Sequence, residues 1–442
     1  MPRRLKNAAL LLMSLIFYAW GEPRYAILML LSVTQGYIFA RLIGKSRGTK
    51  KAKAYLIISL VLSLGMLGVF KYANFFAESF AAVFGLKIAA LNIALPIGIS
   101  FYTFQLISYV IDVYRADVEP QRDYVAFAAY ISMFPQLIAG PIVRYSDIEA
   151  ELTARAYGAD KAAYGARRFI LGLGKKVLIA NVLAELVNAF KASGEKSTLF
   201  YWVYAAAYML HVYFDFSGYS DMAIGLGSIF GFTFPENFNY PYIAASITEF
   251  WRRWHMSLSS WFRDYVYIPL GGSRVKKPRA LLNIATVWML TGLWHGADWN
   301  FVMWGIMFAA LLIAEKTLLL GFIKNHRAIG HIYTLFFVML CFIMFDASGV
   351  KEGFETIAAL FGANAADNTE ALYYLRSYTV PLTVAAFGAT PWPKRIKAKL
   401  EATRVGGAIM AIAEPVALAA LLCLCTAYLI DGSFNPFLYF RF

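Results

Sequence analysis

The sequence contains few charged residues. They make up 15% of its 442 residues, whereas an average soluble domain has about 25%. Hydrophobic residues make up 60% of the chain, and the mean hydropathy is +0.56. This composition excludes an ordinary soluble domain and predicts an integral membrane protein.

Cysteines and common catalytic signatures are also rare or absent. The three cysteines lie in or beside apolar runs without the spacing of metal ligands, so they predict no metal site and say nothing about redox compartment. The sequence has no GxSxG elbow, Walker loop, HExxH motif or dinucleotide-binding glycine pattern, which excludes the common hydrolase, ATPase and dinucleotide-binding classes. No internal repeat is visible, which weakens the hypothesis of an inverted-repeat transporter.

Apolar runs recur along the whole chain. A membrane-spanning helix needs about 20 residues, so we expect an all-α, polytopic membrane domain over residues 1–442, with about ten to twelve membrane helices. Pro135 and Pro141 predict that the fifth apolar run is broken or re-entrant. The candidate helices are 8–20, 25–44, 54–72, 94–113, 124–142, 177–192, 199–215, 281–296, 299–320, 332–348, 372–388 and 408–430.

Lysine and arginine account for the formal net charge of +14, and they concentrate in alternate loops. This bias predicts that the basic loops are cytoplasmic, with the amino terminus inside and the carboxyl terminus outside. The basic loops are 41–53, 144–176, 252–279, 324–327 and 393–404. The apolar run after MPRRLK lacks a small-residue cleavage pattern, so we expect no cleavable signal peptide.

Residues 216–278 form the least hydrophobic block of the chain. They are too polar to span a membrane and too aromatic for a plain loop, which predicts cytoplasmic helices that lie at the interface or dip into the protein. Trp254, Arg252 and Arg253 give this block a basic aromatic surface, for which interfacial anchoring is the simplest interpretation. The turn PLGGSR at 269–274 is a weak signal for phosphate binding.

Only five histidines occur in the sequence. His326 and His331 flank a basic stretch at a predicted helix boundary, and we assign them to the surface. His295 lies near the end of a predicted membrane helix, where an ionisable group costs about 2.5 to 3.5 kcal/mol and commonly marks a functional path. The alternative is a structural hydrogen bond between helices. We favour a function, because histidine can take a proton from a hydroxyl near neutral pH.

His211 and Asp215 are four residues apart and share a helix face if the helix continues that far. Asp221 follows beyond Gly218. The three polar residues lack the dense spacing of a metal site, so we expect no bound metal. A structural polar network that stabilises a buried bend is the better interpretation.

Several motifs resemble the membrane-bound O-acyltransferase family, and within it the bacterial branch of the alginate O-acetylation proteins. Proteins of teichoic-acid D-alanyl transfer are similar at a greater distance. The resemblance covers nearly the whole chain. Its motifs are HVYFDFSGYSDMAIGLG (211–227), PENFNYPYIAASITEFWRRWHMSLSSWFRDYVYIPLGGSR (235–274), LTGLWHGADWNFVMWG (290–305) and the closing NPFLYFRF.

The resemblance implies acyl transfer across the membrane. A cytoplasmic thioester, either acetyl-coenzyme A or an acyl carrier protein, would supply the acyl group, with no tightly bound cofactor. A hydroxyl of an exported or cell-wall polysaccharide outside would receive it, directly or through a periplasmic or extracellular partner. The expected location is the bacterial cytoplasmic membrane, and no nucleic acid is expected as a partner.

The family motifs place the catalytic histidines of this branch at His295 and His255, which line a central funnel from opposite sides. We expect His295 to be the general base or an acyl relay, and His255 to orient donor or acceptor. The residues assigned to substrate binding are Trp254, Arg252, Arg253, Trp294, Asp298 and Asn300. Related chains begin with a further apolar segment that ends in a proline followed by basic residues, whereas Met1 here directly precedes PRRLKN. Either the natural start lies further upstream or this segment is lost.

Two other functions stay open at this point. One is transfer of D-alanine from a carrier protein towards teichoic acid. The other is a pore or transporter for the acyl donor, with a partner performing the chemistry.

Overall fold

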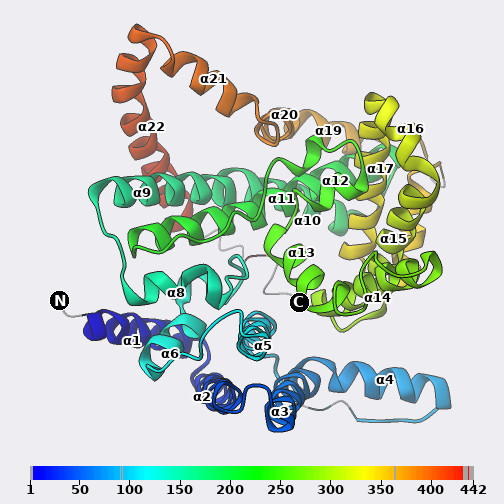
Figure 1. Cartoon of the computed structure of the whole chain (residues 1–442). Helices are drawn as coiled ribbons and strands as arrows, with labels where there is room; N and C mark the ends of the chain where they lie inside the picture. The colour runs from blue at the N-terminus through cyan, green and yellow to red at the C-terminus, as the bar shows by residue number, and fades with distance from the viewer. Residues whose placement is uncertain (1–2, 90, 92, 363–364, 432–436, 438–442) are drawn as a thin grey trace. The chain divides into compact units, whose positions relative to one another are not determined.

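The structure is a computed structural model that describes residues 3–89, 91, 93–362, 365–431 and 437 (Figure 1). Every regular element among these residues is a helix, so the predicted all-α fold is confirmed. Contacts group the chain into two compact units. Unit 1 comprises Met1–Ala166 and Ala223–Pro235, and unit 2 comprises Arg167–Met222 and Glu236–Phe442. The single domain expected over residues 1–442 stays a prediction.

Unit 1 is built around buried aromatic rings. The ring of Tyr109 lies 4.6 Å from that of Phe127 and 4.9 Å from that of Tyr145. The helices of this unit are α1 (Arg3–Gly21), α2 (Pro23–Lys45), α3 (Lys50–Leu67), η1 (Gly68–Tyr72), α4 (Ala73–Phe84), α5 (Ile99–Arg115), α6 (Tyr124–Ser132), α7 (Phe134–Leu137) and α8 (Tyr145–Thr153).

The break predicted in the fifth apolar run is present. Asp123 begins α6 by accepting hydrogen bonds from the backbone nitrogens of Val125 and Ala126, which is the usual role of an N-cap aspartate. The helix ends at Ser132, and only the short α7 follows before an irregular segment. The break lies at Met133. Pro135 follows it in the first turn of α7, where its missing N–H group has no partner within the helix, and Pro141 lies in the irregular segment after α7.

Two long helices belong partly to each unit, α9 (Ala159–Gly174) and α11 (Thr198–Ile229). Unit 2 contains all the other helices. The others are η2 (Lys175–Ala180), α10 (Asn181–Ala192), η3 (Pro241–Ile243), α12 (Ile247–Trp251), α13 (Met256–Phe262), η4 (Arg263–Tyr267), α14 (Lys277–His295), α15 (Trp299–Ala314), η5 (Glu315–Leu319), α16 (Leu320–Asn325), α17 (Arg327–Asp346), α18 (Val350–Ala359), α19 (Thr369–Ser377), α20 (Thr379–Gly388), α21 (Trp392–Glu401) and α22 (Arg404–Ile430).

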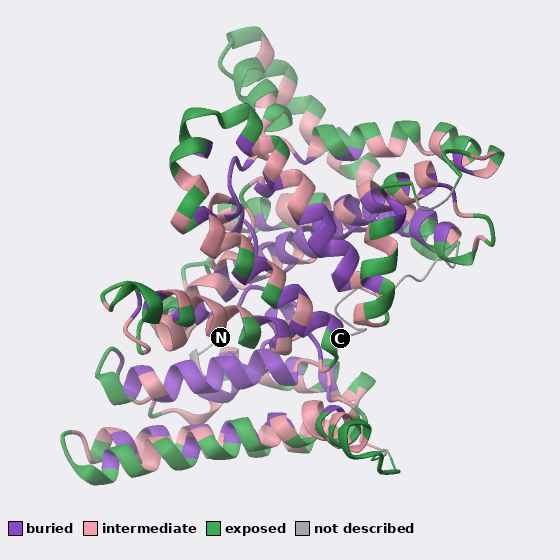
Figure 2. Cartoon of the chain, turned by 90° about the vertical axis from the view of Figure 1, so that its right-hand side faces the viewer, coloured by how far each residue is buried: buried purple, intermediate pink, exposed green. Residues whose placement is uncertain are grey.

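Each of the predicted apolar segments contains a helix, but the helices differ in length and polarity. Among the residues that the structure describes, five helical stretches are long and apolar enough to cross a membrane. They are Pro23–Lys45, Lys50–Phe84, Trp299–Asn325, Arg327–Asp346 and Arg404–Ile430. The last corresponds to α22 (Figure 1), in which Cys425 is the single buried residue, whereas other helices contain long buried stretches (purple in Figure 2). Its exposed apolar face suits lipid contact.

The hairpin of α14 and α15 packs backbone against backbone. A Cβ atom on Gly292 would lie 2.3 Å from the carbonyl oxygen of Phe301, and one on Gly305 would lie 2.3 Å from that of Trp288. Real Cβ atoms do not approach that closely, so both positions require glycine. A backbone carbonyl therefore lies against each of these two glycines.

Replacing Gly305 by Ala is expected to destabilise the protein, because the added methyl group forces α14 away from α15. Overpacking of this kind costs typically about 1 to 3 kcal/mol. Thermal unfolding in detergent would measure the loss. The matched control is Gly321→Ala in α16, where an added Cβ meets nothing within 4 Å. Equal melting temperatures for the two variants would contradict the proposed packing.

Candidate functional site

His255 lies at the junction of two short helices, α12 and α13. Its backbone is left-handed, with φ of 44°, a conformation that non-glycine residues rarely adopt and that costs free energy. Its side chain is 0% exposed. A strained backbone that delivers a buried imidazole to one place is a feature found at functional sites.

Glu315 of η5 fixes the start of α12. Its buried carboxylate accepts hydrogen bonds from the backbone nitrogens of Ile247 and Thr248 and from the hydroxyl of Thr248. Negative charge at a helix start is favourable because the first backbone N–H groups have no partner within the helix. The residues before His255 are thereby anchored to the end of α15. Sequence reasoning missed Glu315, although a carboxylate inside an apolar run was a visible signal.

Asn237 holds the residues around His255 on the other side. Its Oδ1 accepts hydrogen bonds from Nδ1 of His255 (3.2 Å), the backbone nitrogen of Ser257 (3.2 Å) and the hydroxyl of Ser257 (2.9 Å). Its backbone carbonyl accepts a fourth from the nitrogen of Met256. Asn237 is fully buried. Asn237 lies in the motif at residues 235–274, and the sequence predicted no role for it.

His255 and His295 come together although 40 residues separate them in the chain. Their ring centroids are 6.5 Å apart, and Trp294 contacts both, at 5.8 Å from His255 and 4.9 Å from His295. The side chain of His295 is 7% exposed. The two histidines that the family motifs singled out therefore occupy one buried site within unit 2.

Aromatic rings surround the pair. Phe216 lies 4.7 Å from the ring of His255, while Trp304 and Phe345 lie 4.9 Å and 5.4 Å from that of His295. Burial in this environment lowers the pKa of His255 to about 3, because an apolar surrounding disfavours the charged form. His255 is therefore neutral at physiological pH and has one ring nitrogen able to accept a proton.

The other residues assigned to substrate binding differ in position. Trp254 is buried and stacks on Phe250 at 5.5 Å. Arg253 is bound to Glu249 at 2.8 Å, and Arg252 is exposed. Trp294 is buried and contacts the rings of both histidines. Whether these residues contact a substrate stays a prediction.

Asp298 and Asn300 belong to the start of α15. Asp298 is exposed and its carboxylate accepts a hydrogen bond from the backbone nitrogen of Trp299, so it is the N-cap of this helix. Asn300 is buried, and its amide nitrogen donates to the carbonyl oxygens of Phe345 (3.3 Å) and Ala347 (2.7 Å). Asn300 thus holds the end of α17, whose Phe345 packs on His295.

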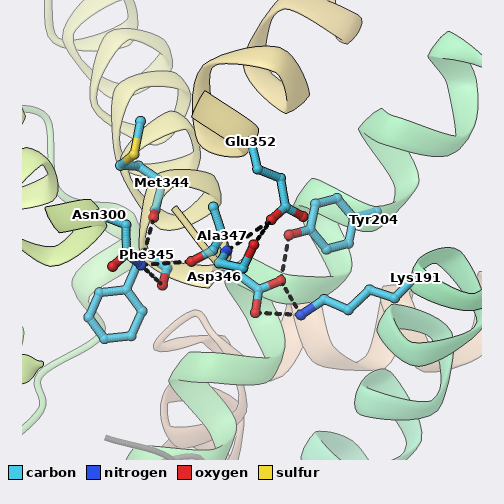
Figure 3. A network of polar contacts seen from close by, with 9 residues as sticks. Lys191, Tyr204, Asn300, Met344, Phe345, Asp346, Ala347 and Glu352 are labelled. Carbon is cyan, nitrogen blue, oxygen red and sulfur yellow. Dashed lines mark hydrogen bonds and ion pairs between the residues drawn. The ribbon is translucent and has the colours of Figure 1, made fainter. Parts of the chain in front are cut away.

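A polar cluster continues from the end of α17 (Figure 3). Asp346 binds the ammonium of Lys191 at 2.7 Å and accepts a hydrogen bond from the hydroxyl of Tyr204 at 2.6 Å. These contacts join α10, α11 and α17. The cluster fixes the carboxyl end of α17 beside the residues that surround His295.

The polar residues His211, Asp215 and Asp221 lie on one unbroken helix, α11. Asp215 forms a buried ion pair with Lys176 at 2.5 Å, and His211 bonds the carbonyl of Ala180 through Nδ1 at 2.8 Å. Asp221 is bound by Lys175 and Arg168, each at 2.6 Å. The sequence predicted a polar network at a buried bend. In the structure α11 runs through all three positions as one helix, and each residue bonds to a partner outside α11, for the two aspartates to cations that the sequence analysis did not identify.

Within the residues that the structure describes, no group of three or more histidine, cysteine or acidic side chains is arranged to hold a metal ion. The chemistry available to the pair of histidines is proton transfer, hydrogen bonding or covalent relay of an acyl group.

Comparison of the chain with protein-family models identifies the family to which it belongs. The model of the membrane-bound O-acyltransferase family matches residues 121–350, a range that includes both histidines. The chain belongs to this family. It is accordingly a multi-pass membrane protein, as its apolar helices indicate, and the buried histidines are the candidate centre of an O-acyltransferase.

Curated relatives in this family carry three different names. A probable alginate O-acetylase AlgI of Azotobacter vinelandii is 39% identical over 476 residues, covering 100% of this chain and 95% of the relative. A peptidoglycan O-acetyltransferase of Helicobacter pylori is 33% identical over 80% of this chain and 73% of its own length. A teichoic acid D-alanyltransferase of Bacillus subtilis is 32% identical over 50% of this chain and 59% of its own length.

Replacing Lys176 by Met is expected to destabilise this O-acyltransferase strongly, because the buried carboxylate of Asp215 loses its cation. Breaking one half of a buried pair typically costs about 3 to 5 kcal/mol, whereas replacing both halves costs much less. Thermal unfolding in detergent of Lys176→Met, Asp215→Leu and the double variant would measure the coupling.

The control is Lys351→Met, which removes an exposed ion pair with Glu355, because such pairs contribute about 0 to 1 kcal/mol. If the double variant lost as much stability as the sum of the two single variants, Lys176 and Asp215 would not be coupled.

Proposed function

We propose that this chain transfers an acetyl group from a cytoplasmic thioester to hydroxyl groups of an exported or cell-wall polysaccharide, in the bacterial cytoplasmic membrane. The observation that carries the proposal is the buried pair of His255 and His295 in a member of the O-acyltransferase family. The centroids of their rings are 6.5 Å apart. The names of the relatives support acetyl as the group and a polysaccharide as the acceptor.

The reaction requires removal of one proton and stabilisation of one developing charge. The acceptor oxygen attacks the thioester carbonyl carbon, and a carbon–oxygen bond forms. The carbon–sulfur bond breaks, and the sulfur leaves with the bonding electrons. A neutral imidazole takes the hydroxyl proton and returns it to the leaving thiolate, so that no net proton is consumed.

His295 is proposed as the general base or as an acyl relay, and His255 as the group that orients donor or acceptor. The low dielectric of a buried aromatic site strengthens any dipole directed at the carbonyl oxygen. The donor is proposed to be acetyl-coenzyme A or an acyl carrier protein thioester, with no tightly bound cofactor. A periplasmic or extracellular partner is proposed to complete transfer to the polymer.

A second candidate is D-alanyl transfer towards teichoic acid. It is favoured by the similarity to the teichoic acid D-alanyltransferase of Bacillus subtilis, which covers half of this chain. The longer similarity to the alginate and peptidoglycan enzymes favours acetyl transfer. Mass analysis of polymer esters in a deletion strain separates the two, since loss of D-alanyl esters with intact acetyl esters would favour the second candidate.

Replacing His295 by Ala is expected to abolish acetyl transfer, because the variant has no imidazole to act as general base or as acyl relay. Removal of a catalytic acid–base group alone costs roughly 100-fold or more. Acetyl esters on the polysaccharide would be quantified in a deletion strain that expresses the variant at the normal level in the membrane. The control is His326→Ala, because His326 is exposed and its Nδ1 bonds only a carbonyl of the preceding helical turn. Full acetylation by a normally inserted His295→Ala protein would overturn the catalytic assignment.

A further inference from the structure

The amide of Asn237 determines which nitrogen of His255 carries the proton. Its Oδ1 lies 3.2 Å from the backbone nitrogen of Ser257. A backbone N–H group only donates, so the atom facing it is the amide oxygen and not the amide nitrogen. The same oxygen lies 3.2 Å from Nδ1 of His255. Because an amide oxygen only accepts, Nδ1 carries the hydrogen.

The opposite ring nitrogen of His255 is consequently the proton acceptor. In neutral histidine one nitrogen donates and the other holds a lone pair, so the lone pair is on Nε2. This atom is buried and has no hydrogen-bond partner among the residues that the structure describes. A buried acceptor without a partner is costly to the fold. Its cost is offset if a hydroxyl from outside the chain binds there.

We infer that Asn237 is a positioning residue that fixes His255 in the tautomer whose Nε2 accepts the hydrogen of the acceptor hydroxyl. The inference rests on the proposed function, which supplies that hydroxyl. As the hydroxyl oxygen forms its bond to the acyl carbon, its proton passes to Nε2. The leaving group departs with its electron pair and takes up this proton. Proton acceptance is thereby assigned to His255. Of the two roles proposed for His295, this leaves the acyl relay.

The surroundings of His255 favour this assignment. The side chains that contact its ring are Phe216 of α11, Asn237, and Trp294 and His295 of α14. His295 is the single titratable group among these contacts, and none is a carboxylate. The neutral amide of Asn237 therefore orients the imidazole without adding a charge. A base held by a third group that sets its tautomer is the arrangement of catalytic triads.

Three variants of the full-length protein test the inference. Asn237→Ala removes the acceptor for Nδ1, and we expect acetyl transfer in membranes to fall about 10- to 100-fold, as expected for a misplaced catalytic group. Ser257→Ala is the matched control, since it removes one hydrogen bond to the same oxygen but leaves the contact with His255 intact. We expect this control to keep most of its activity.

Asn237→Asp supplies a readout that a purely structural role would not change. Its carboxylate accepts the same hydrogen bonds, and its negative charge raises the pKa of His255. Neutral His255 is the active form, so activity is lost as the pH falls through this pKa. The acidic limb of the pH–rate profile is therefore expected at higher pH in Asn237→Asp than in the wild type, with activity above that of Asn237→Ala.

The result that would overturn the inference is an Asn237→Asp protein whose profile matches the wild type, or one as inactive as Asn237→Ala. Equal losses of acetyl-transfer activity in Asn237→Ala and Ser257→Ala would also overturn the inference. If Asn237→Ala fails to insert into the membrane, the pH–rate profile of Asn237→Asp alone tests the inference. Full activity of His255→Ala and His295→Ala would instead refute the proposed function, so the two failures are distinguishable.

Discussion

Helix α15 is the common support of the two histidines. Its amino-terminal half packs against α14 through glycines, and α14 ends at His295. At its other end, the carboxylate of Glu315 holds the first backbone nitrogens of α12, which leads into His255. One continuous helical segment thus fixes two imidazoles that belong to different elements, since His255 precedes α13 and His295 ends α14. Displacing either contact would change the distance between them.

The two ends of α15 hold their neighbours by different interactions. One end holds the long helix α14 by close packing, and the other holds the short helix α12 by hydrogen bonds. The α14–α15 contact joins two apolar helices, where only close packing without a Cβ atom sets the separation. The α12 contact joins a five-residue helix to its support, and a helix that short is unstable alone. A buried carboxylate that satisfies its free N–H groups gives this helix a fixed start, which the strained backbone of His255 requires.

The sequence was sufficient to predict much of the fold and the site. Long apolar runs have a strong helical signal, and each contains a helix in the structure. The proline-broken run was predicted because proline acts locally. His295 and His255 stood out because a polar group is costly at membrane depth and because their motifs are specific.

The parts that sequence reasoning missed are partners distant along the chain. Asn237 lies 18 residues from His255, Lys176 lies 39 from Asp215, and Glu315 lies 67 from Thr248. A single sequence shows that a polar residue is present in an apolar run but not which segment satisfies it. Asp298 is a different case. Its carboxylate caps a helix, a role that the sequence analysis did not assign, and its role in substrate binding stays a prediction.

The polar network of α11 has a consequence for the site beyond stability. Asp215 is locked by Lys176, and the next residue, Phe216, packs edge-on against the ring of His255 at 4.7 Å. Adjacent residues on a helix point in different directions but move together, because the backbone between them is rigid. The ion pair of Asp215 with Lys176 therefore also fixes the position of the neighbouring Phe216 ring, which contacts His255. A charge that is expensive to bury is accommodated where it also fixes the position of a proton acceptor.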